Sequence, residues 1–330
     1  VKGFGEKYPD IQLTVKDGSS MEIESWLIAG KIDVGLLSNC FTAKLDFFPL
    51  LRDPLYAVLP PDVMPGDTVP ITDFNGKDFF VPSNGIGSYV SGAGQALRLY
   101  AERFVLPAHE KKKNAVNILG ATPLDFSANG QVQSIARRLT EGGFSVQSVW
   151  AMGSETAAID RAGEAEVNLV VSSVGLPAAE FLRERFGMPY VVGAPLGDTV
   201  SALLLGALQK SIRTGENEIL PAGTPDAPDT VILGESVTSR SLAAALLLDY
   251  GLCAEVICPV ELPRELEGSF CRQIEDEQDL QAALSGARRV IADPLFAPIV
   301  PQGAQFFPLP HEAYSGRIYR RQIPNHVTTW

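Results

Sequence analysis

The chain has 330 residues, of which 45% are apolar and 20% charged, and it carries a formal net charge of −12 at pH 7. This length predicts two or three domains, and the composition excludes a disordered protein. An acidic surface is unsuited to tracking phosphates, so we expect no direct nucleic-acid binding. No apolar run reaches the roughly 18 residues that cross a bilayer, so we expect no membrane contact.

The first 82 residues predict a small α/β subdomain. Residues 11–15 alternate apolar and polar side chains as a half-buried strand does. Residues 19–30 predict a helix with a serine as its N-terminal cap and Gly30 as its C-terminal cap. Three short apolar runs then predict strands, the first of them buried, at residues 32–37, 47–51 and 55–59.

From residue 83 onward, strands alternate with helices. Residues 85–104 predict a helix that ends before Pro107, and residues 114–130 predict a buried strand followed by a polar loop. The remaining elements before residue 215 are expected as helices at residues 131–141, 155–165, 177–186 and 199–212, and as strands at residues 144–150, 167–171 and 188–192.

Residues 215–229 are rich in Pro, Gly and Glu and predict a linker. A second series follows it, with strands expected at 231–234, 254–260 and 289–292 and helices at 239–250 and 276–287. The fold class is therefore α/β, with two or more parallel-sheet, Rossmann-like βα units that carry helices on both faces. The predicted domains are residues 1–82, 83–214 and 230–330.

Ligands of parallel sheets bind beyond the carboxyl ends of the strands, and a cleft between two such units is the default binding site. Small and hydroxylated residues there let backbone N–H groups approach an anion or a cofactor. The alternative is that the same residue types only cap helices. The loop at 120–130 matches neither the phosphate-binding loop nor the dinucleotide fingerprint. The candidate ligand contacts at the strand ends are Gly120, Asp125, Ser154, Ser172, Ser173, Gly175, Gly234, Glu235, Ser236 and Ser239.

Cysteine and histidine positions predict no metal site in this chain. Cys253 and Cys258 are separated by an odd number of residues in a strand-like run, so their side chains should point to opposite faces. We interpret them as buried structural thiols, with an iron–sulfur ligand set as the alternative. The three histidines are scattered, and no Ser-His-Asp arrangement identifies catalytic residues. Four cysteines and no signal peptide favour the reducing cytoplasm.

Three sequence segments of the N-terminal part form a family pattern. They are FGEKYPDIQLTVKDGSSMEIESWLIAGKIDVGLL, FFPLLRDPLYAVLPPD and VPITDFNGKDFFVP. Their order and spacing resemble the first subdomain of the effector-binding domain of LysR-type transcription regulators. The resemblance covers about a quarter of the chain. An effector cleft in that family needs both subdomains, and only the first is matched, so the resemblance by itself does not imply a working ligand sensor.

A wider pattern runs through the rest of the chain. Its segments are NAVNILGATPLDF, GFSVQSVWAMGS, AEVNLVVSSVGLPAAEFLRERFGMPYVVGAPLGDT, ALLLDYGLCAEVICP and FFPLPHEAYSGRIYRR. They resemble the nitrogenase component 1 family, including its cofactor-assembly and reductase relatives. In that resemblance, Ser172 stands where the catalytic subunit of nitrogenase has its cofactor-ligating cysteine. His311 lies in a family-like motif, either as a loop or interface residue or as a contact to a cofactor or partner subunit.

The leading hypothesis is an oxidoreductase subunit or metallocofactor-assembly scaffold that resembles nitrogenase component 1. A hydroxyl group is a poor iron ligand compared with a thiolate, so we expect no cluster ligands in this chain. An iron–sulfur cluster or metallocofactor would then be bound together with a partner subunit or in a homo-oligomer. The alternative is a LysR-type effector-binding region that senses a small molecule. A third interpretation is that parts of two proteins are joined near residues 60–90.

Overall fold

The computed structural model describes residues 14, 20–36, 45–46, 88–221, 228–316, 318 and 323–328. The chain divides into two compact units, Val1–Gly87 and Ser88–Trp330. In the first unit, helix α2 (Ser20–Ile28) forms where the sequence predicts a helix, and Gly30 follows it with a φ of 64°. Such a left-handed residue ends helices, and glycine adopts it without a steric penalty. The strands predicted at 47–51 and 55–59 lie outside the described residues, as does all of 11–15 except residue 14.

The buried strand predicted at residues 32–37 is wrong over the described residues 32–36. No strand is present there, and Val34 and Leu36 are 80% and 73% exposed. Gly35 instead lies against α2, where an added Cβ atom would come within 2.6 Å of Ile23 Cγ2. An apolar run becomes a strand only when a neighbouring strand pairs with it, and no described residue does so here.

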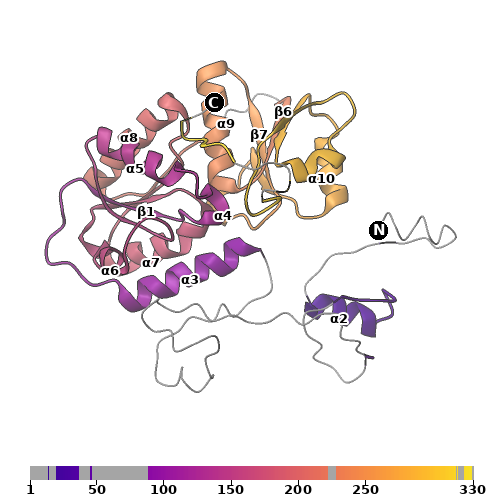
Figure 1. Ribbon diagram of the computed structural model, residues 1–330, viewed down its shortest axis with the longest axis horizontal. Helices are drawn as coiled ribbons and strands as arrows, with labels where there is room; N and C mark the ends of the chain where they lie inside the picture. Colours follow the sequence, from indigo (N-terminus) through magenta and orange to yellow (C-terminus); the bar gives the residue numbers. More distant parts are fainter. Residues whose placement is uncertain are drawn as a thin grey trace. The chain divides into compact units, whose positions relative to one another are not determined.

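The second unit contains two five-stranded sheets in which every pairing is parallel (Figure 1). The first sheet has the order β2-β1-β3-β4-β5. Its strands are β2 (Ser145–Val149), β1 (Ala115–Leu119), β3 (Val167–Val170), β4 (Tyr190–Val192) and β5 (Glu218–Ile219). The three central strands are buried along their whole length. Continuous apolar strands are typical of a parallel sheet that is covered on both faces.

The second sheet has the order β10-β9-β6-β7-β8. Its strands are β10 (Gln305–Pro308), β9 (Arg289–Ala292), β6 (Thr230–Leu233), β7 (Ala254–Cys258) and β8 (Cys271–Gln273). Two parallel sheets with interleaved helices confirm the predicted α/β class.

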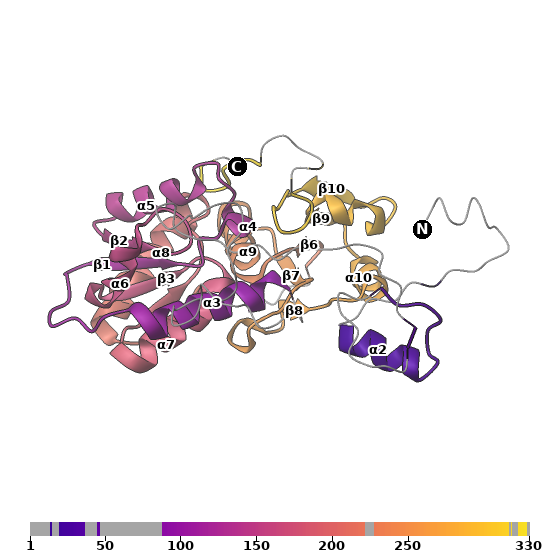
Figure 2. The ribbon, with the colours of Figure 1, turned by 60° about the horizontal axis from the view of Figure 1, so that its bottom comes forward.

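Helices cover both faces of the first sheet. In Figure 1, α5 (Gln131–Glu141) and α8 (Gly197–Thr214) lie above it, and α3 (Tyr89–Phe104), α6 (Thr156–Asp160) and α7 (Leu176–Phe186) lie below. The turned view in Figure 2 keeps α5 and α7 on opposite sides of β1 to β3. Among the described residues, no helix is long and apolar enough to cross a membrane.

One hydrophobic core joins the two sheets. It contains Val116 and Leu169 of the first sheet, Ile232 and Val256 of the second, and Leu242 of α9 (Ser236–Tyr250), the helix that lies between the sheets in Figure 1. Helix α10 (Glu277–Leu284) covers the other side of the second sheet and belongs to a separate apolar cluster. The predicted division into domains at 83–214 and 230–330 stays a prediction.

Several elements differ from the sequence-based expectation. The helix expected over 155–165 is split into α6 and the 3-10 helix η3 (Ala162–Glu164). The break allows Leu106 to pass close to Gly163, where an added Cβ atom would lie 2.2 Å from the Leu106 carbonyl oxygen. Strand β5 lies within the predicted linker. The sequence patterns also missed β8, β10 and the one-turn helix α4 (Pro123–Phe126).

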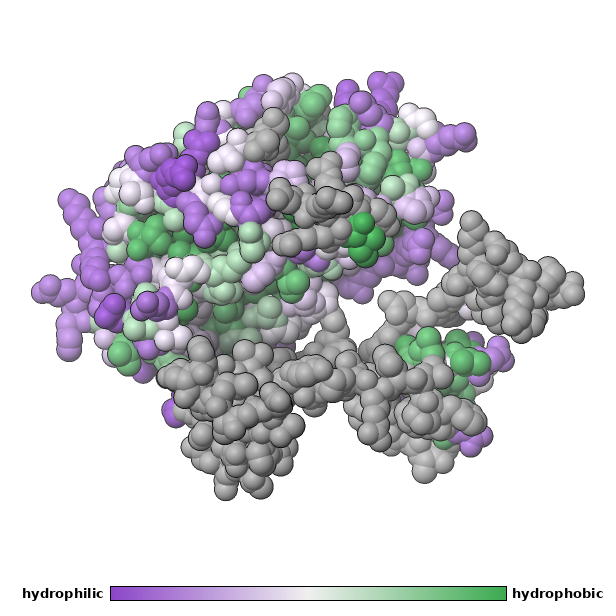
Figure 3. All heavy atoms as spheres, viewed as in Figure 1, coloured by the Kyte–Doolittle hydropathy of each residue, from purple (hydrophilic) through white to green (hydrophobic). Residues whose placement is uncertain are grey.

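The surface of the second unit carries both hydrophilic and apolar residues. Figure 3 shows hydrophilic residues concentrated toward the outer edge of the viewed face, with apolar residues between them. The exposed large apolar side chains of this unit come from several separate elements, and they include Leu99 of α3, Leu203 of α8, Leu248 of α9 and Leu295. Scattered exposure of this kind is normal for a folded protein.

Candidate functional site

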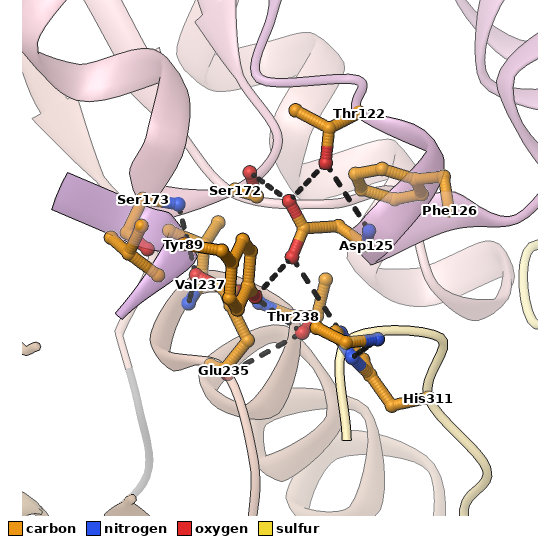
Figure 4. Close-up of polar contacts among 12 residues, drawn as sticks. Tyr89, Thr122, Asp125, Phe126, Ser172, Ser173, Glu235, Val237, Thr238 and His311 are labelled. Carbon is orange, nitrogen blue, oxygen red and sulfur yellow. Dashed lines mark hydrogen bonds and ion pairs between the residues drawn. The ribbon is translucent and has the colours of Figure 1, made fainter. Parts of the chain in front are cut away.

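A buried polar cluster lies where the carboxyl ends of strands from both sheets meet (Figure 4). In a parallel sheet the loops that follow the strands all leave from the same edge, so residues far apart in sequence come together. Here the loops after β1, β3, β6, β9 and β10 contribute polar residues. The strand-end cluster consists of Thr122, Asp125, Ser172, Ser173, Glu235, Asp293 and His311, together with Tyr89 from α3.

Asp125 is the centre of this cluster. Thr122 caps α4, and the single turn that follows directs the Asp125 carboxylate inward. Its Oδ1 accepts a hydrogen bond from the Tyr89 hydroxyl at 2.6 Å, and its Oδ2 accepts from Thr122 Oγ1 at 2.8 Å and Ser172 Oγ at 2.9 Å. The carboxyl group is fully buried, and these three donors come from three different segments of the chain.

The surroundings of Asp125 shift its ionisation toward neutral pH. Burial, followed by the negative charge of Glu235, raises the pKa of Asp125 to about 7. Hydrogen bonds from Tyr89, Thr122 and Ser172 oppose this rise because they stabilise the carboxylate. Asp125 can therefore gain or release a proton near neutral pH.

Glu235 connects the two sheets through backbone contacts. It follows β6 and caps α9, where its two carboxylate oxygens accept from the N–H groups of Val237 and Thr238. Its Oε1 also accepts from the Ser173 N–H at 2.9 Å, in the loop after β3. Ser236 and Thr238 hydroxyls complete its shell. A buried carboxylate with this many donors is stabilised without a cationic partner.

His311 faces Asp125 from the second sheet. Its Nδ1 accepts from the Ala313 N–H at 3.2 Å, so the ring proton of neutral His311 resides on Nε2. That Nε2 lies 3.6 Å from Asp125 Oδ1, and it has no hydrogen-bond partner among the described residues. Burial lowers the pKa of His311, although the charges of Glu235, Asp293 and Glu312 act against it.

Asp293 holds the His311 segment in place. It follows β9, and its Oδ2 accepts from the His311 N–H at 2.7 Å and from Ser315 Oγ at 2.8 Å. Its Oδ1 accepts from the Leu295 N–H and caps η6 (Pro294–Ile299). The position of His311 is thus fixed by a carboxylate of the neighbouring strand end.

Gly120 and Gly175 allow the loops after β1 and β3 to touch. Gly120 has a φ of 84°, and an added Cβ atom would lie 2.8 Å from both Gly175 N and Ser172 O. An added Cβ atom on Gly175 would lie 2.6 Å from the Leu119 carbonyl carbon. Neither position accommodates a side chain, so the glycines bring Ser172 within reach of Asp125.

The structure brings together five of the residues predicted from the sequence, Asp125, Ser172, Ser173, Glu235 and His311. Ser236 reaches Glu235 at 3.2 Å, and Ser239 lies against Gly234, where an added Cβ atom would be 2.7 Å from its Oγ. Ser154 does not join the strand-end cluster. Its Oγ instead accepts a hydrogen bond from the Val149 N–H at the end of β2. The role of these residues as ligand contacts stays a prediction.

Sequence reasoning missed Tyr89, Thr122 and Asp293. Asp293 directly follows a strand that the sequence predicts to end at residue 292, so the strand-end rule could have found it. Thr122 precedes a proline, which is a signal for a helix start. Tyr89 belongs to a helix start rather than a strand end, and no local pattern marks it.

The three cysteines within the described residues do not supply the ligand set of an iron–sulfur cluster. Cys258 and Cys271 are fully buried on neighbouring strands, with 3.9 Å between their sulfur atoms. Cys253 is only partly buried, and Cys40 lies outside the described residues. Within the described residues, no group of three or more His, Cys, Asp or Glu side chains is arranged to hold a metal ion. Four thiolates are the usual ligands of such clusters, so these residues do not fit one.

Two protein families match the chain. Residues 78–232 match the family of nitrogenase component 1 type oxidoreductases, and residues 1–116 match the LysR substrate binding domain. Both resemblances inferred from the sequence are thereby confirmed. The two matches overlap over residues 78–116, a stretch that contains α3.

Several curated relatives are subunits of light-independent protochlorophyllide reductases. One from Bradyrhizobium sp. is 27% identical over 203 residues, which covers 57% of this chain and 38% of that protein. Another, from Prosthecochloris aestuarii, is 35% identical over 97 residues, covering 29% of this chain and 18% of that protein. The chain thus spans less than two fifths of the length of these relatives.

Solved structures of nitrogenase Cp1 also match. The structure at pH 6.5 gives a TM-score of 0.46 at 13% identity and covers 73% of this chain and 61% of that one. The structure at pH 5 gives a TM-score of 0.37 at 17% identity and covers 57% of this chain and 40% of that one.

Proposed function

We propose that this chain is a nitrogenase component 1-type subunit of an oxidoreductase, or a scaffold on which the metallocofactor of such an enzyme is assembled. The observation that carries the proposal is the strand-end cluster around Asp125, because the loops after β1 and β3 lie inside the matched residues 78–232. The reductase subunits among the relatives support the same class.

The chemistry of the cluster suits a reduction, which consumes protons as well as electrons. Asp125 can hold a proton near neutral pH, and Ser172 and Tyr89 fix the orientation of its carboxyl group. His311 presents a neutral Nε2–H toward the same carboxyl oxygen. This chain would thus contribute proton-holding groups and a dry, polar environment.

The redox group is expected to be bound with a partner subunit. The Ser172 hydroxyl lies within hydrogen-bond distance of both Gly120 O and Asp125 Oδ2, so its proton is already engaged by one of these two oxygens. The relatives are each named as one subunit of an enzyme, which supports an assembly with a second polypeptide or a second copy of this chain. A cytoplasmic location agrees with this assignment, because the free thiols of Cys253, Cys258 and Cys271 suit a reducing compartment.

Anaerobic affinity purification of the full chain from its native host tests the proposal. Iron content and the absorption spectrum are measured on the purified complex, and again on the chain after its partners are removed. We expect iron in the complex and well under one iron atom per isolated chain. Stoichiometric iron that stays with the isolated chain would show that it carries its own ligands. A preparation without any iron-containing complex would overturn the assignment to an oxidoreductase.

A second candidate function is small-molecule sensing by the N-terminal part. The match of residues 1–116 to the LysR substrate binding domain favours it. A thermal-shift screen of small metabolites tests this function, since a ligand that binds only the folded state raises the melting temperature. Peptide mass mapping over residues 55–95 of the native protein would distinguish one covalent chain from parts of two proteins.

A further inference from the structure

Tyr89 enters the strand-end cluster from outside both sheets. It is the first residue of α3, and its hydroxyl donates to Asp125 Oδ1 at 2.6 Å. Figure 4 shows its ring beside Asp125, with Ser173 on one side and His311 on the other. The phenol group thus occupies the position beyond the strand ends where parallel sheets bind their ligands.

An aromatic wall continues from this ring. The ring centroids of Tyr89 and His311 are 6.5 Å apart, those of His311 and Tyr314 are 4.8 Å apart, and those of Tyr314 and Phe296 are 5.5 Å apart. Aromatic rings attract one another at centroid separations of about 4.5–7 Å, and all three of these contacts lie within that range. The position that Tyr89 occupies is therefore built for an aromatic group.

Polar atoms at this wall lack partners. His311 Nε2 and Tyr314 Oη are buried, and neither has a hydrogen-bond partner in the described part of the chain. Buried polar groups are normally satisfied, so the unpartnered His311 Nε2, which lies 3.6 Å from Asp125 Oδ1, indicates that a polar group can be received there. A hydroxyl group, which both donates and accepts, matches a carboxyl acceptor and an Nε2–H donor at once.

The charges around the position restrict the ligand further. Asp125, Glu235 and Asp293 are carboxyl groups of the same cluster, so an anionic ligand would meet repulsion. Burial and the charge of Asp125 raise the pKa of Tyr89 well above its usual value, so its phenol stays neutral. A neutral aromatic hydroxyl fits this environment, whereas a carboxylate or phosphate does not.

We propose that Tyr89 is a built-in occupant of a ligand site at the strand ends, and that this site takes a neutral aromatic ring carrying a hydroxyl group. The first turn of α3 must withdraw before such a ligand enters. Ser88 holds this turn, because its backbone N–H and its hydroxyl both donate to the Glu261 carboxylate. Since the first unit ends at Gly87, its chain continues directly into this turn. The proposal does not depend on the oxidoreductase assignment, because no iron or partner is involved.

The test deletes the Tyr89 side chain and adds phenol, the same aromatic hydroxyl group, as a free ligand. Tyr89→Ala deletes a phenol group, so we compare phenol with benzene and benzoate as ligands of the full chain. The control is Tyr100→Ala on the same helix, where the lost hydroxyl donated to Asp160 Oδ1 at 3.0 Å. Melting temperatures and calorimetric binding are measured for both variants and the natural sequence.

Phenol should raise the melting temperature of Tyr89→Ala by about 3–6 °C at a tenfold excess over its dissociation constant. Benzene should bind at least about tenfold more weakly, because one charge-assisted hydrogen bond is absent, and benzoate should not bind. The natural sequence and Tyr100→Ala should show no phenol-dependent shift.

Three results would overturn the proposal. One is a folded Tyr89→Ala protein that phenol does not stabilise, and another is an equal shift in Tyr100→Ala. The third is a Tyr89→Ala protein that fails to fold with or without phenol, because a removable occupant must leave the sheets around its site intact.

Discussion

His311 Nε2 lies 3.6 Å from Asp125 Oδ1, although the two residues follow strands of different sheets. The pair is not a fixed salt bridge, because burial favours the uncharged form of each partner. Burial raises the pKa of Asp125 to about 7, and burial lowers the pKa of His311. Both shifts favour the uncharged forms, and the Nδ1 contact to the Ala313 N–H keeps the His311 proton on the side facing Asp125.

Replacing Asp125 with Asn should flatten the dependence of stability on pH. Because the pKa of Asp125 is about 7 in the folded state and near 4 in the unfolded state, the folded state binds more protons between these values. The contribution of Asp125 to the free energy of unfolding is fully present below about pH 4, and it is lost as the pH rises to about 7. The loss is on the order of 4 kcal/mol.

Urea unfolding of the natural sequence and Asp125→Asn at pH 4, 5.5, 7 and 8.5 measures this effect. The difference in unfolding free energy between the two proteins should change over pH 4–7 and stay constant above about pH 7.5. A difference that is independent of pH over the whole range would show that Asp125 titrates at an ordinary pKa.

Gly175→Ala should disrupt the contact between the loops after β1 and β3. The new Cβ atom would lie 2.6 Å from the Leu119 carbonyl carbon, and backbone cannot move aside as a side chain can. We expect a loss of about 3 kcal/mol in unfolding free energy. Gly206→Ala in α8 is the matched control, because an added Cβ atom there meets nothing within 4 Å. It should gain about 0.5–1 kcal/mol from helix propensity. Equal effects of the two substitutions would contradict the close approach.

Cys258 and Cys271 should resist alkylation in the folded protein. Both are fully buried in the core beneath α9, whereas Cys253 is partly accessible. Iodoacetamide should reach the buried pair only when the protein unfolds, so we expect labelling about 1,000-fold slower than after denaturation. Mass spectrometry of the labelled peptides measures each cysteine separately. Labelling of Cys271 as fast as Cys253 would show that the edge strand β8 opens independently.

The sequence predicts the central strands well because burial on both faces leaves a continuous apolar signal. The run AVNIL of β1 and the run TVIL of β6 are buried throughout. Edge strands lack this signal. In β8, CRQ has two exposed residues, and in β10, QFFP is largely exposed and ends in a proline. Periodicity also carries no information about Gly163, where the predicted helix breaks because another segment passes against its backbone.

The candidate site was partly predictable for the same physical reason. Asp125, Ser173 and Glu235 follow apolar strands, and parallel topology brings strand ends together whatever the sequence distance. Tyr89 depends on how α3 packs, and the contact between Cys258 and Cys271 depends on which strand lies next to β7. The spacing of residues along the chain predicts neither the position of Tyr89 nor the contact between Cys258 and Cys271. Both became visible only in the tertiary structure.

The central claim is that the strand ends of both sheets form one electrostatically coupled site. A double-mutant cycle with Asp125→Asn and Glu235→Gln tests it, because these residues follow β1 and β6 and the charge of Glu235 raises the pKa of Asp125. Unfolding free energies of the four proteins should show a coupling of about 1 kcal/mol or more at pH 8.5, where Asp125 is ionised. At pH 5, where Asp125 is protonated, the coupling should fall below about 0.5 kcal/mol. Additive effects at both pH values would contradict a single site.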